Sequence, residues 1–343
     1  MKKFKPLLIL LLKILVSAGL LVYFFTRIHI ERFVQTFAKA DLSIIVVVLL
    51  VYLVPQFVGA VRWMVLARPL GFKTPLKVLV NYYLVGMFFN LFAPGTVGGD
   101  VSRIYYLARD GEENLNKRLG GATMHAAVSV FIDRVIGMAV LVWLGAAGLF
   151  LFPQYAIPAA VRHLTFALSG AFLVAGLMLP LARRVLPADG HPIVVKLRVA
   201  VRAYQAHWQA IPQAILLSLV VHFMQAWIHM LLGRAIQIDI PYSFCIILYP
   251  LVGTFSALPI SLNGLGLREG GYIFLFQFIG VSSEKGVAFG LLLFMVVALD
   301  SLIGGLLFLV QKNSKAARAI GRTQEPTPAP EEKRRKVGNG RKV

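Results

Sequence analysis

One stretch of this chain occurs twice, about 165 residues apart, and each copy interrupts an apolar segment with helix-ending residues. Duplicated membrane segments with broken helices at matching positions are typical of transporters whose substrate path lies between the repeats. The matches weighted most are Arg, Pro, Gly and Asp, because chance identities between apolar residues are common. The first copy contributes Phe57, Ala60, Met64, Leu66, Arg68, Pro75, Pro94, Gly99, Arg103, Asp133, Ile136 and Gly137, which match Phe223, Ala226, Met230, Leu232, Arg234, Pro241, Pro259, Gly264, Arg268, Asp300, Ile303 and Gly304.

The apolar content predicts an all-α polytopic membrane protein with about six to eight transmembrane helices. The 343 residues are 58% hydrophobic with a mean hydropathy of +0.75, and such chains are integral to membranes. The first apolar run follows three lysines and is about 20 residues long, so we expect an uncleaved helix rather than a signal peptide. The long apolar segments are roughly 6–25, 43–66, 76–93, 121–152, 156–181, 211–233, 242–261 and 286–310, and the shorter 96–109 and 266–280 follow the two breaks.

The positions of Lys and Arg distinguish two membrane topologies. If every long segment crosses the membrane and the two short ones do not, the 35 Lys and Arg residues are shared rather evenly between the two sides. If 76–109 and 242–280 are paired segments that enter and leave on one side, most of these residues lie on the side of the amino terminus. The positive-inside rule favours the second arrangement. It makes the repeats inverted, with two re-entrant hairpins, although pairs of full crossings fit the charge distribution equally well.

This topology gives one membrane domain over 1–312, with repeat one at about 43–150 and repeat two at about 211–310. Residues 183–210 combine Lys and Arg with apolar residues and predict an amphipathic helix on the membrane surface. We expect 313–343 to be a basic, disordered cytoplasmic tail, because it is rich in Pro, Glu, Lys and Arg. Both termini are then cytoplasmic, and the protein is a multi-pass protein of the cell (inner) membrane.

Several chemistries find no support in the sequence. The net charge of +20 lies in loops and the tail and has no nucleic-acid-binding motif beside it, so we expect no nucleic-acid partner. His222 and His229 share a helix face, but without a nearby carboxylate or an H-E-x-x-H pattern they favour buried histidines over a metal site. The single Cys245 excludes an internal disulfide. There is no P-loop and no nucleophile elbow, and we expect neither a cofactor nor a catalytic residue.

The two breaks carry the candidate binding residues. Each has a proline that ends a helix, glycines that let the backbone turn, and an arginine near the start of the next helix. Helix starts attract anions and an arginine adds a full charge, so the pair suits a phosphate or another anionic head group. The alternative is that Asp100–Arg103 and Arg268–Glu269 only neutralise each other. The expected binding residues are Arg62, Asn90, Asp100, Arg103, Asn263, Arg268 and Glu269, and the expected turn residues are Pro94, Gly98, Gly99, Pro259, Gly264 and Gly266.

Three of the ionisable residues inside predicted spans are candidates for a functional role. Asp133 and Arg134 lie in one long apolar helix and Asp300 in the matching one. Such groups are costly in a bilayer and suggest function by default. The aspartates either pair with Arg103 and Arg268, carry a proton during turnover, or form fixed ion pairs that specify packing. Arg62, next to Trp63, either reaches the head-group cavity or anchors the helix at the membrane interface.

Three segments, Phe89–Arg109, Asp133–Gly137 and Pro259–Gly270, resemble the family of lysylphosphatidylglycerol synthase transmembrane regions, also called flippase-like or YbhN-like membrane proteins. The likeness covers about residues 7–312. In larger members this region is similar to a lipid flippase fused to a soluble aminoacyl transferase, and that transferase is absent here. The resemblance therefore implies movement of lipid between leaflets rather than aminoacylation, with phospholipid, glycolipid, polyprenyl-linked and hopanoid pathways all open.

The sequence thus predicts a non-enzymatic lipid flippase. The head group of an anionic or modified membrane lipid would enter a polar cavity between the repeats. Arg103 and Arg268 would bind it, Asp100 and Glu269 would orient them, and the intramembrane aspartates would balance or couple charge. The alternatives are a membrane enzyme acting on lipid phosphates and a non-catalytic subunit that partners a lipid-biosynthesis enzyme.

Overall fold

The computed structural model describes residues 4–27, 29–92, 97–115, 119–178, 198, 201–258, 260–261 and 264–323. These residues form helices and short connections, without a strand among them. The expected all-α membrane fold is confirmed. The helices are α1 (Phe4–Arg27), α2 (Ile30–Ala38), α3 (Leu42–Ala67), η1 (Arg68–Leu70), α4 (Leu76–Phe92), α5 (Val97–Leu115), α6 (Leu119–Leu151), α7 (Ala159–Met178), α10 (Ala210–Ala235), α11 (Tyr242–Ser256), α12 (Leu267–Phe276), η3 (Gln277–Ile279) and α13 (Ser283–Thr323).

Five helices are long and apolar enough to cross a membrane. They are Leu42–Leu70, Gly121–Leu151, Ala159–Met178, Ala210–Ala235 and Ser283–Val310. Each coincides with a segment predicted to cross in the hairpin topology. The first arms of the two predicted hairpins are instead shorter apolar helices, Leu76–Leu91 and Tyr242–Ser256, and the first helix contributes the shorter apolar stretch Ile14–Phe24.

The helices of the two repeats pack in a reciprocal pattern. α13 packs on α4, and its counterpart α6 packs on α11, the counterpart of α4. α3 packs along its own counterpart α10. These two run antiparallel, because the Asp41 amide before α3 donates to the Ala235 carbonyl at the end of α10, whereas Arg62 near the end of α3 reaches Ser218 near the start of α10. Exchanging each helix for its counterpart therefore reproduces the contacts of the other half.

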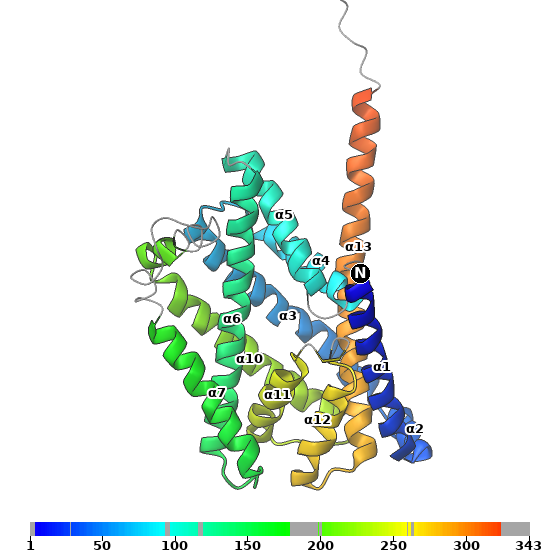
Figure 1. The fold of residues 1–343 in the computed structure, drawn as a ribbon. Coiled ribbons are helices and arrows are strands. Elements are labelled where there is room, and N and C mark those ends of the chain that lie inside the picture. The colour runs from blue at the N-terminus through cyan, green and yellow to red at the C-terminus, as the bar shows by residue number, and fades with distance from the viewer. Residues whose placement is uncertain are drawn as a thin grey trace, which may run out of the picture.

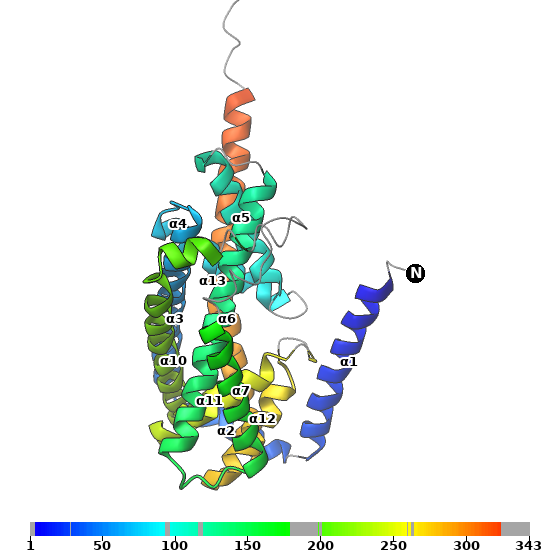
Figure 2. The ribbon, with the colours of Figure 1, turned by 60° about the vertical axis from the view of Figure 1, so that its left-hand side comes forward.

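The two helix pairs that follow α3 and α10 lie in opposite halves of the molecule. In Figures 1 and 2, α4 and α5 occupy the upper half, and α11 and α12 occupy the lower half. The chain enters α4 from the upper end of the molecule and enters α11 from the lower end. The ends at which each pair turns back therefore face each other midway along the molecule.

Glycines allow the closest helix contacts. A Cβ atom added at Gly99 on α5 would overlap the Gly86 carbonyl and the Asn90 amide of α4. A Cβ atom at Gly304 on α13 would overlap the Leu84 carbonyl of α4. Because real Cβ atoms do not approach backbone this closely, glycine at these two positions sets the distance between α4 and its neighbours on both sides.

Two apolar cores stabilise the bundle. One contains Trp63, Leu79, Leu107 and Ala126, from α3 to α6, together with Tyr204 and Ala214. The other is built mainly by α10 to α13, with the aromatic rings of Phe244, Tyr272, Phe276 and Phe289 among its buried members. The polar cavity described next is lined by elements of both cores.

The predicted carboxyl-terminal tail and the predicted amphipathic helix are described only in part. α13 continues to Thr323, eleven residues beyond the expected end of the membrane domain at residue 312, while residues 324–343 lie outside the described part. Most of the predicted amphipathic helix, 183–197, also lies outside the described residues. Residues 201–206 are helical, with Tyr204 4% exposed and its hydroxyl donating to the Leu66 carbonyl at 2.8 Å.

Candidate functional site

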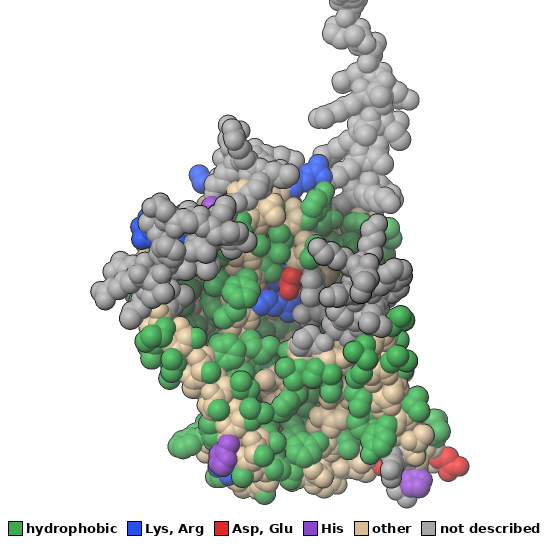
Figure 3. All heavy atoms as spheres, in the orientation of Figure 1, with side chains coloured by type: hydrophobic (Ala, Val, Ile, Leu, Met, Phe, Trp, Pro, Cys, Tyr) green, Lys and Arg blue, Asp and Glu red, His purple; other side chains and the backbone are tan. Residues whose placement is uncertain are grey.

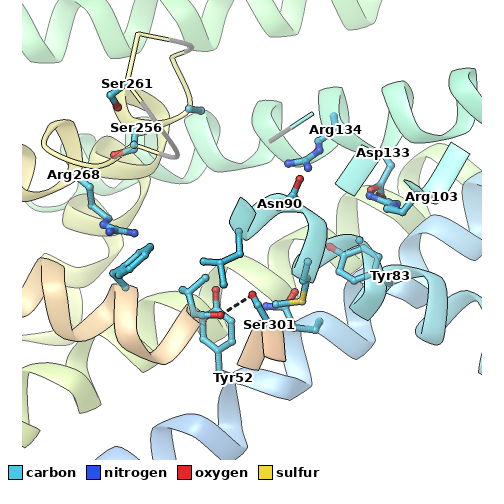
Figure 4. A pocket seen from close by; sticks show the side chains of 18 of the residues that line it. Tyr52, Tyr83, Asn90, Arg103, Asp133, Arg134, Ser256, Ser261, Arg268 and Ser301 are labelled. Carbon is cyan, nitrogen blue, oxygen red and sulfur yellow. Dashed lines mark hydrogen bonds and ion pairs between the residues drawn. The ribbon is translucent and has the colours of Figure 1, made fainter. Parts of the chain in front are cut away.

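A cavity of about 370 Å³ lies where the two hairpin regions meet. α3, α4, α5 and α6 line one side (Figure 4). α11, α12 and α13 line the other, together with Ala257, Leu258, Ser261 and Gly264. Its polar lining residues are Tyr52, Gln56, Arg62, Tyr83, Asn90, Arg103, Asp133, Arg134, Ser256, Ser261, Arg268 and Ser301. The predicted gathering of Arg103 and Arg268 at one cavity is therefore observed.

Asp133 forms the buried centre of the first half of the site. Its Oδ1 accepts a hydrogen bond from Arg62 Nε at 2.8 Å, and its Oδ2 accepts one from Arg103 Nη2 at 3.0 Å. The three side chains are 1%, 8% and 5% exposed. The guanidinium of Arg103 also lies over Trp63, at 4.2 Å from its ring centroid, and over Tyr83, at 4.6 Å. One carboxylate thus holds two arginines, and the expected Asp133–Arg103 pair is confirmed.

Arg62 is part of this cluster rather than an interface anchor. Its Nη1 donates to Ser218 Oγ of α10 at 2.9 Å, and the neighbouring Trp63 is fully buried with its indole N–H donating to Ser129 Oγ. A residue pair at a membrane boundary would be exposed to head groups, so the anchor interpretation is wrong. The ion pair joins residues 71 apart in sequence, and no local signal predicts it.

Arg134 is the most exposed arginine of the cavity. It donates through Nε to both oxygens of Asp100 at 3.0 Å, and its side chain is 42% exposed. Asp100 lies farther from Arg103, at 3.8 Å, so its main partner is Arg134 rather than the arginine that its position in the sequence suggested. Figure 3 shows the corresponding opening: charged atoms lie in a hollow midway along an otherwise apolar face.

Arg268 on α12 faces the cavity from the second half (Figure 4). It donates through Nε and Nη2 to Glu269 Oε1, at 3.3 and 3.1 Å. Its guanidinium lies 5.6 Å from the Phe294 ring centroid of α13. Glu269 is fully buried and Arg268 is 12% exposed at its side chain. Glu269 therefore orients Arg268, as expected, and leaves the arginine in contact with the cavity.

The helix starts themselves are already occupied by protein groups. The Gly99 amide in the first turn of α5 donates to Asn90 Oδ1 at 2.7 Å. The Gly266 amide before α12 donates to Glu269 Oε2 at 2.6 Å. The expected role of these helix starts in anion binding is therefore not seen in this conformation. Asn90 and Glu269 fasten the two helix starts, and the arginines carry the positive charge.

Asp300 differs from its sequence counterpart Asp133. It is 3% exposed on α13, and its Oδ2 has no hydrogen-bond partner among the described residues. Within that part of the chain Arg268 pairs with Glu269 instead. The expected Asp300–Arg268 pair is thus wrong for this conformation, because the residue next to Arg268 supplies a nearer carboxylate.

The charge on the cavity wall is positive. Arg62, Arg103, Arg134 and Arg268 line it, with Asp133 as the one acidic residue among the described lining residues. Asp100 and Glu269, which are not among the lining residues, pair with Arg134 and Arg268. Even with these two carboxylates included, cations outnumber anions, so the cavity favours an anionic group.

The remaining predicted residues are those of the two breaks in the apolar segments. Gly264 and Gly266 have φ values of 75° and 83°, in the left-handed region that favours glycine, so their predicted role as turn residues is consistent with the backbone. The prediction that Gly98 and Gly99 are turn residues is wrong, because both lie in the first turn of α5, where the lack of a side chain at Gly99 allows the close approach of α4. Pro94, Pro259 and Asn263 lie outside the described residues.

Sequence reasoning missed the neutral wall of the cavity. Tyr52, Gln56, Tyr83 and Ser301 line it, but tyrosines and serines in apolar helices are too common to be recognised without the fold. The histidines lie behind this wall and not in it. His222 contacts Tyr249 and the Gly137 carbonyl, and His229 contacts Tyr272, all at 2.8–2.9 Å, as the prediction of buried histidines requires.

Comparison with known proteins identifies one family. The profile described as "Lysylphosphatidylglycerol synthase TM region" matches residues 10–304, which include both hairpin regions and every charged residue of the cavity. A search of curated proteins finds no match.

Proposed function

Because the chain belongs to the family of lysylphosphatidylglycerol synthase transmembrane regions, we propose that it moves an anionic or modified lipid between the two leaflets of the membrane. The family places the chain among membrane proteins of lipid metabolism or transport. The finer proposal rests on the site. The head group binds in the arginine-lined cavity while the acyl chains stay in the surrounding bilayer.

One observation carries this proposal: arginines from both halves of the duplicated chain line one cavity. Arg103 and Arg134 come from α5 and α6, and Arg268 comes from α12. Arginine suits phosphate because its planar fork donates two parallel hydrogen bonds to phosphate oxygens. Two of the four arginines are committed to Asp133, so Arg134 and Arg268 are the proposed direct ligands. Arg62 and Arg103 then supply positive potential from fixed positions.

The shape of the site fits a lipid better than a soluble anion. The charged opening lies midway along a face covered by apolar side chains (Figure 3). The helices α5 and α6, which help to line the cavity, expose apolar side chains such as Val101, Tyr105 and Phe131, and the lining residue Leu258 is also exposed. A soluble substrate would have to cross this apolar belt, whereas a lipid enters sideways with its chains still in contact with it. The opening therefore matches a molecule that has a charged head and apolar tails.

We further propose that the two halves are inverted repeats with re-entrant hairpins. The antiparallel packing of α3 on α10, the reciprocal helix contacts and the opposite placement of the two hairpins support this. Two inverted halves around one site allow the cavity to open to either side by rocking of one half against the other, which is alternating access. Backbone turns at mid-membrane depth are tolerated here because they border a polar cavity rather than lipid.

The proposed orientation follows from surface charge. Among the described residues, the blue Lys and Arg atoms of Figure 3 gather mainly at its upper end, where α3 ends and α4 begins. The positive-inside rule makes this end cytoplasmic. The α4–α5 hairpin then enters from the cytoplasmic side and the α11–α12 hairpin from the opposite side of the cell membrane.

The test is translocation of a fluorescent anionic lipid in proteoliposomes. Wild-type protein is expected to move it between leaflets, and Arg268→Ala is expected to slow it about tenfold to a hundredfold, since a hydrogen bond to a charged group contributes about 1.5–3 kcal/mol. Arg268→Lys should retain part of the rate. Arg234→Ala removes an exposed arginine outside the cavity and is the matched control. Equal rates in wild type and Arg268→Ala, or lipid turnover in detergent without translocation, would contradict the proposal and favour an enzyme.

A further inference from the structure

Asp300 is a buried acid without a cationic partner among the described residues. It lies on the membrane-spanning part of α13, is 3% exposed, and its Oδ2 accepts no hydrogen bond from the described residues. The other fully buried acids next to the cavity are paired. Asp133 holds two arginines, and Glu269 holds Arg268 and the Gly266 amide. Asp300 is therefore exceptional within the described part of this site.

Comparison of the two halves shows which residues near Asp300 differ from those near Asp133. At the offset that aligns α3 with α10, the position of Arg62 is occupied by Ile228, which is fully buried. At the offset that aligns α5 with α12, Ile104 is replaced by Glu269, which binds the arginine that corresponds to Arg103. The second half therefore has the matching aspartate without an equivalent of Arg62, and its matching arginine, Arg268, pairs with Glu269.

This arrangement determines the favoured chemical form of Asp300. An ionised carboxylate in an apolar interior costs several kcal/mol unless it is paired and fully hydrogen-bonded. An ionisable residue inside a membrane span is therefore a candidate for a functional role. With neither compensation present, the neutral acid is the form that fits this conformation. Asp133, in contrast, is held as an anion by two guanidinium groups.

Asp300 is adjacent in sequence to a residue that lines the cavity. The adjacent Ser301 lines the cavity, as do Val297 and Tyr52, and Figure 4 shows Tyr52 and Ser301 close together between Arg268 and the Asp133–Arg103 pair. Phe294, which contacts Arg268, precedes Asp300 by six residues, about 9 Å along the helix axis.

The other titratable groups around this part of α13 are few. α12 places Glu269 against Gly290, and α10 and α12 place His229 and Tyr272 against Phe289, all N-terminal to Asp300. α4 contacts α13 through the Leu84 carbonyl and Phe88. The titratable residues on the helices packed against α13 are Glu31 and Arg32 on α2, Tyr52 and Arg62 on α3, Lys77, Tyr82 and Tyr83 on α4, His222, His229 and Arg234 on α10, and Arg268, Glu269 and Tyr272 on α12.

We propose that Asp300 is a proton-binding site that couples movement of the anionic lipid to movement of a proton. This inference rests on the proposed transport function. In the conformation described here the carboxyl carries the proton. When the halves rearrange and water reaches Asp300, the carboxyl O–H bond breaks and the proton leaves to water. The resulting carboxylate replaces the departing lipid phosphate as a partner of Arg268. Protonation from water on the return step releases Arg268 for the next lipid.

Infrared spectroscopy of the purified protein tests the protonated state directly. Wild type is expected to show the carbonyl-stretch band of a buried protonated carboxylic acid at neutral pH. Asp300→Asn should remove this band, and Asp300→Glu should shift it without removing it. Asp133→Asn should leave the band in place, because Asp133 is expected to be ionised. A wild-type spectrum without such a band, or a band that survives in Asp300→Asn, would overturn the proposal.

Translocation across an imposed pH gradient tests the coupling. In proteoliposomes the wild-type rate is expected to rise several-fold for one direction of the gradient and to fall for the other. Asp300→Asn should lose this dependence, and Asp300→Glu should regain it in part. Wild-type translocation that ignores the gradient, or gradient dependence that persists in Asp300→Asn, refutes coupling while leaving lipid transport intact. If wild type translocates no lipid at all, both the transport function and the coupling fail.

Discussion

The two matched aspartates give a sharp prediction about stability. Asp133→Asn removes the charge that holds Arg62 at 2.8 Å and Arg103 at 3.0 Å. The asparagine keeps one carbonyl oxygen, so one arginine retains a neutral acceptor and the other loses its partner. Within the described residues, Arg62 then remains buried without a counter-charge, and Arg103 keeps only the more distant Asp100, at 3.8 Å.

The expected cost is about 3–5 kcal/mol, the range for breaking a buried ion pair by removing one member. Two pairs are broken, but their energies do not add, because they share one carboxylate and the cavity admits water to the freed guanidinium groups. Asp300→Asn replaces a neutral acid with a neutral amide of the same shape and breaks no ion pair. Its expected cost is below about 1 kcal/mol.

The assay is unfolding of the purified protein in detergent mixtures of increasing denaturing strength, with helix content as the readout. The free energy of unfolding should fall strongly for Asp133→Asn and little for Asp300→Asn. A fall of less than about 1 kcal/mol for Asp133→Asn would refute the reasoning that Asp133 is a fixed anion. Equal losses for the two variants would refute the distinction between the halves.

Three further predictions follow from named contacts. Gly99→Ala should destabilise the protein by about 1–3 kcal/mol, because the new Cβ overlaps the Gly86 carbonyl, whereas Gly121→Ala, with open space around it, should be neutral or slightly stabilising; a thermal-shift comparison checks both. Glu269→Gln should lower the free energy of unfolding by about 1–3 kcal/mol. It should also raise the amount of anionic lipid that the protein retains, because the Glu269 carboxylate no longer competes with lipid for Arg268. A variant that loses stability and also retains less anionic lipid would contradict this. In a Cys245→Ala background, a membrane-impermeant thiol reagent should label Lys73→Cys from the cytoplasmic side and Ser283→Cys from the opposite side, and labelling of both from one side would contradict the inverted topology.

Much of the fold follows from local sequence signals. Apolar segments long enough to cross a bilayer predicted the spans, and their positions agree with the helices within a few residues. The proline at position 94 correctly predicted the end of α4, which stops at Phe92. The glycines were less informative, since α5 begins at Val97 and includes Gly98 and Gly99. These signals depend only on neighbouring residues, so they can be recognised in the sequence without the tertiary structure.

The site was predicted only in part, because its geometry depends on long-range contacts. That Arg103 and Arg268 share a cavity could be inferred from the duplication, and the Asp133–Arg103 pair from charge. The acid that pairs with each arginine could not be predicted. Asp100 pairs mainly with Arg134, and Arg268 pairs with Glu269 rather than with Asp300. These choices depend on side-chain direction and on distances of a few ångströms, which sequence spacing does not contain.

The two halves also illustrate how a duplicated sequence diverges in chemistry while keeping its fold. Helix contacts remain reciprocal, yet the replacement of Arg62 by Ile228 changes the charge around the matched aspartate. Burial of an apolar residue preserves packing at that position, so stability does not require the arginine there. The charge difference between Asp133 and Asp300 is therefore where a difference in function between the halves is expected.

The most direct test of the central claim is native mass spectrometry of lipids that stay bound to the purified protein. If the cavity binds a lipid head group between its two halves, wild type retains anionic lipid in preference to zwitterionic lipid. Arg134→Ala and Arg268→Ala then each lose most of it, while Arg234→Ala retains it. Retention that does not depend on lipid charge, or that is unchanged in both cavity variants, would contradict the claim that these arginines bind a lipid.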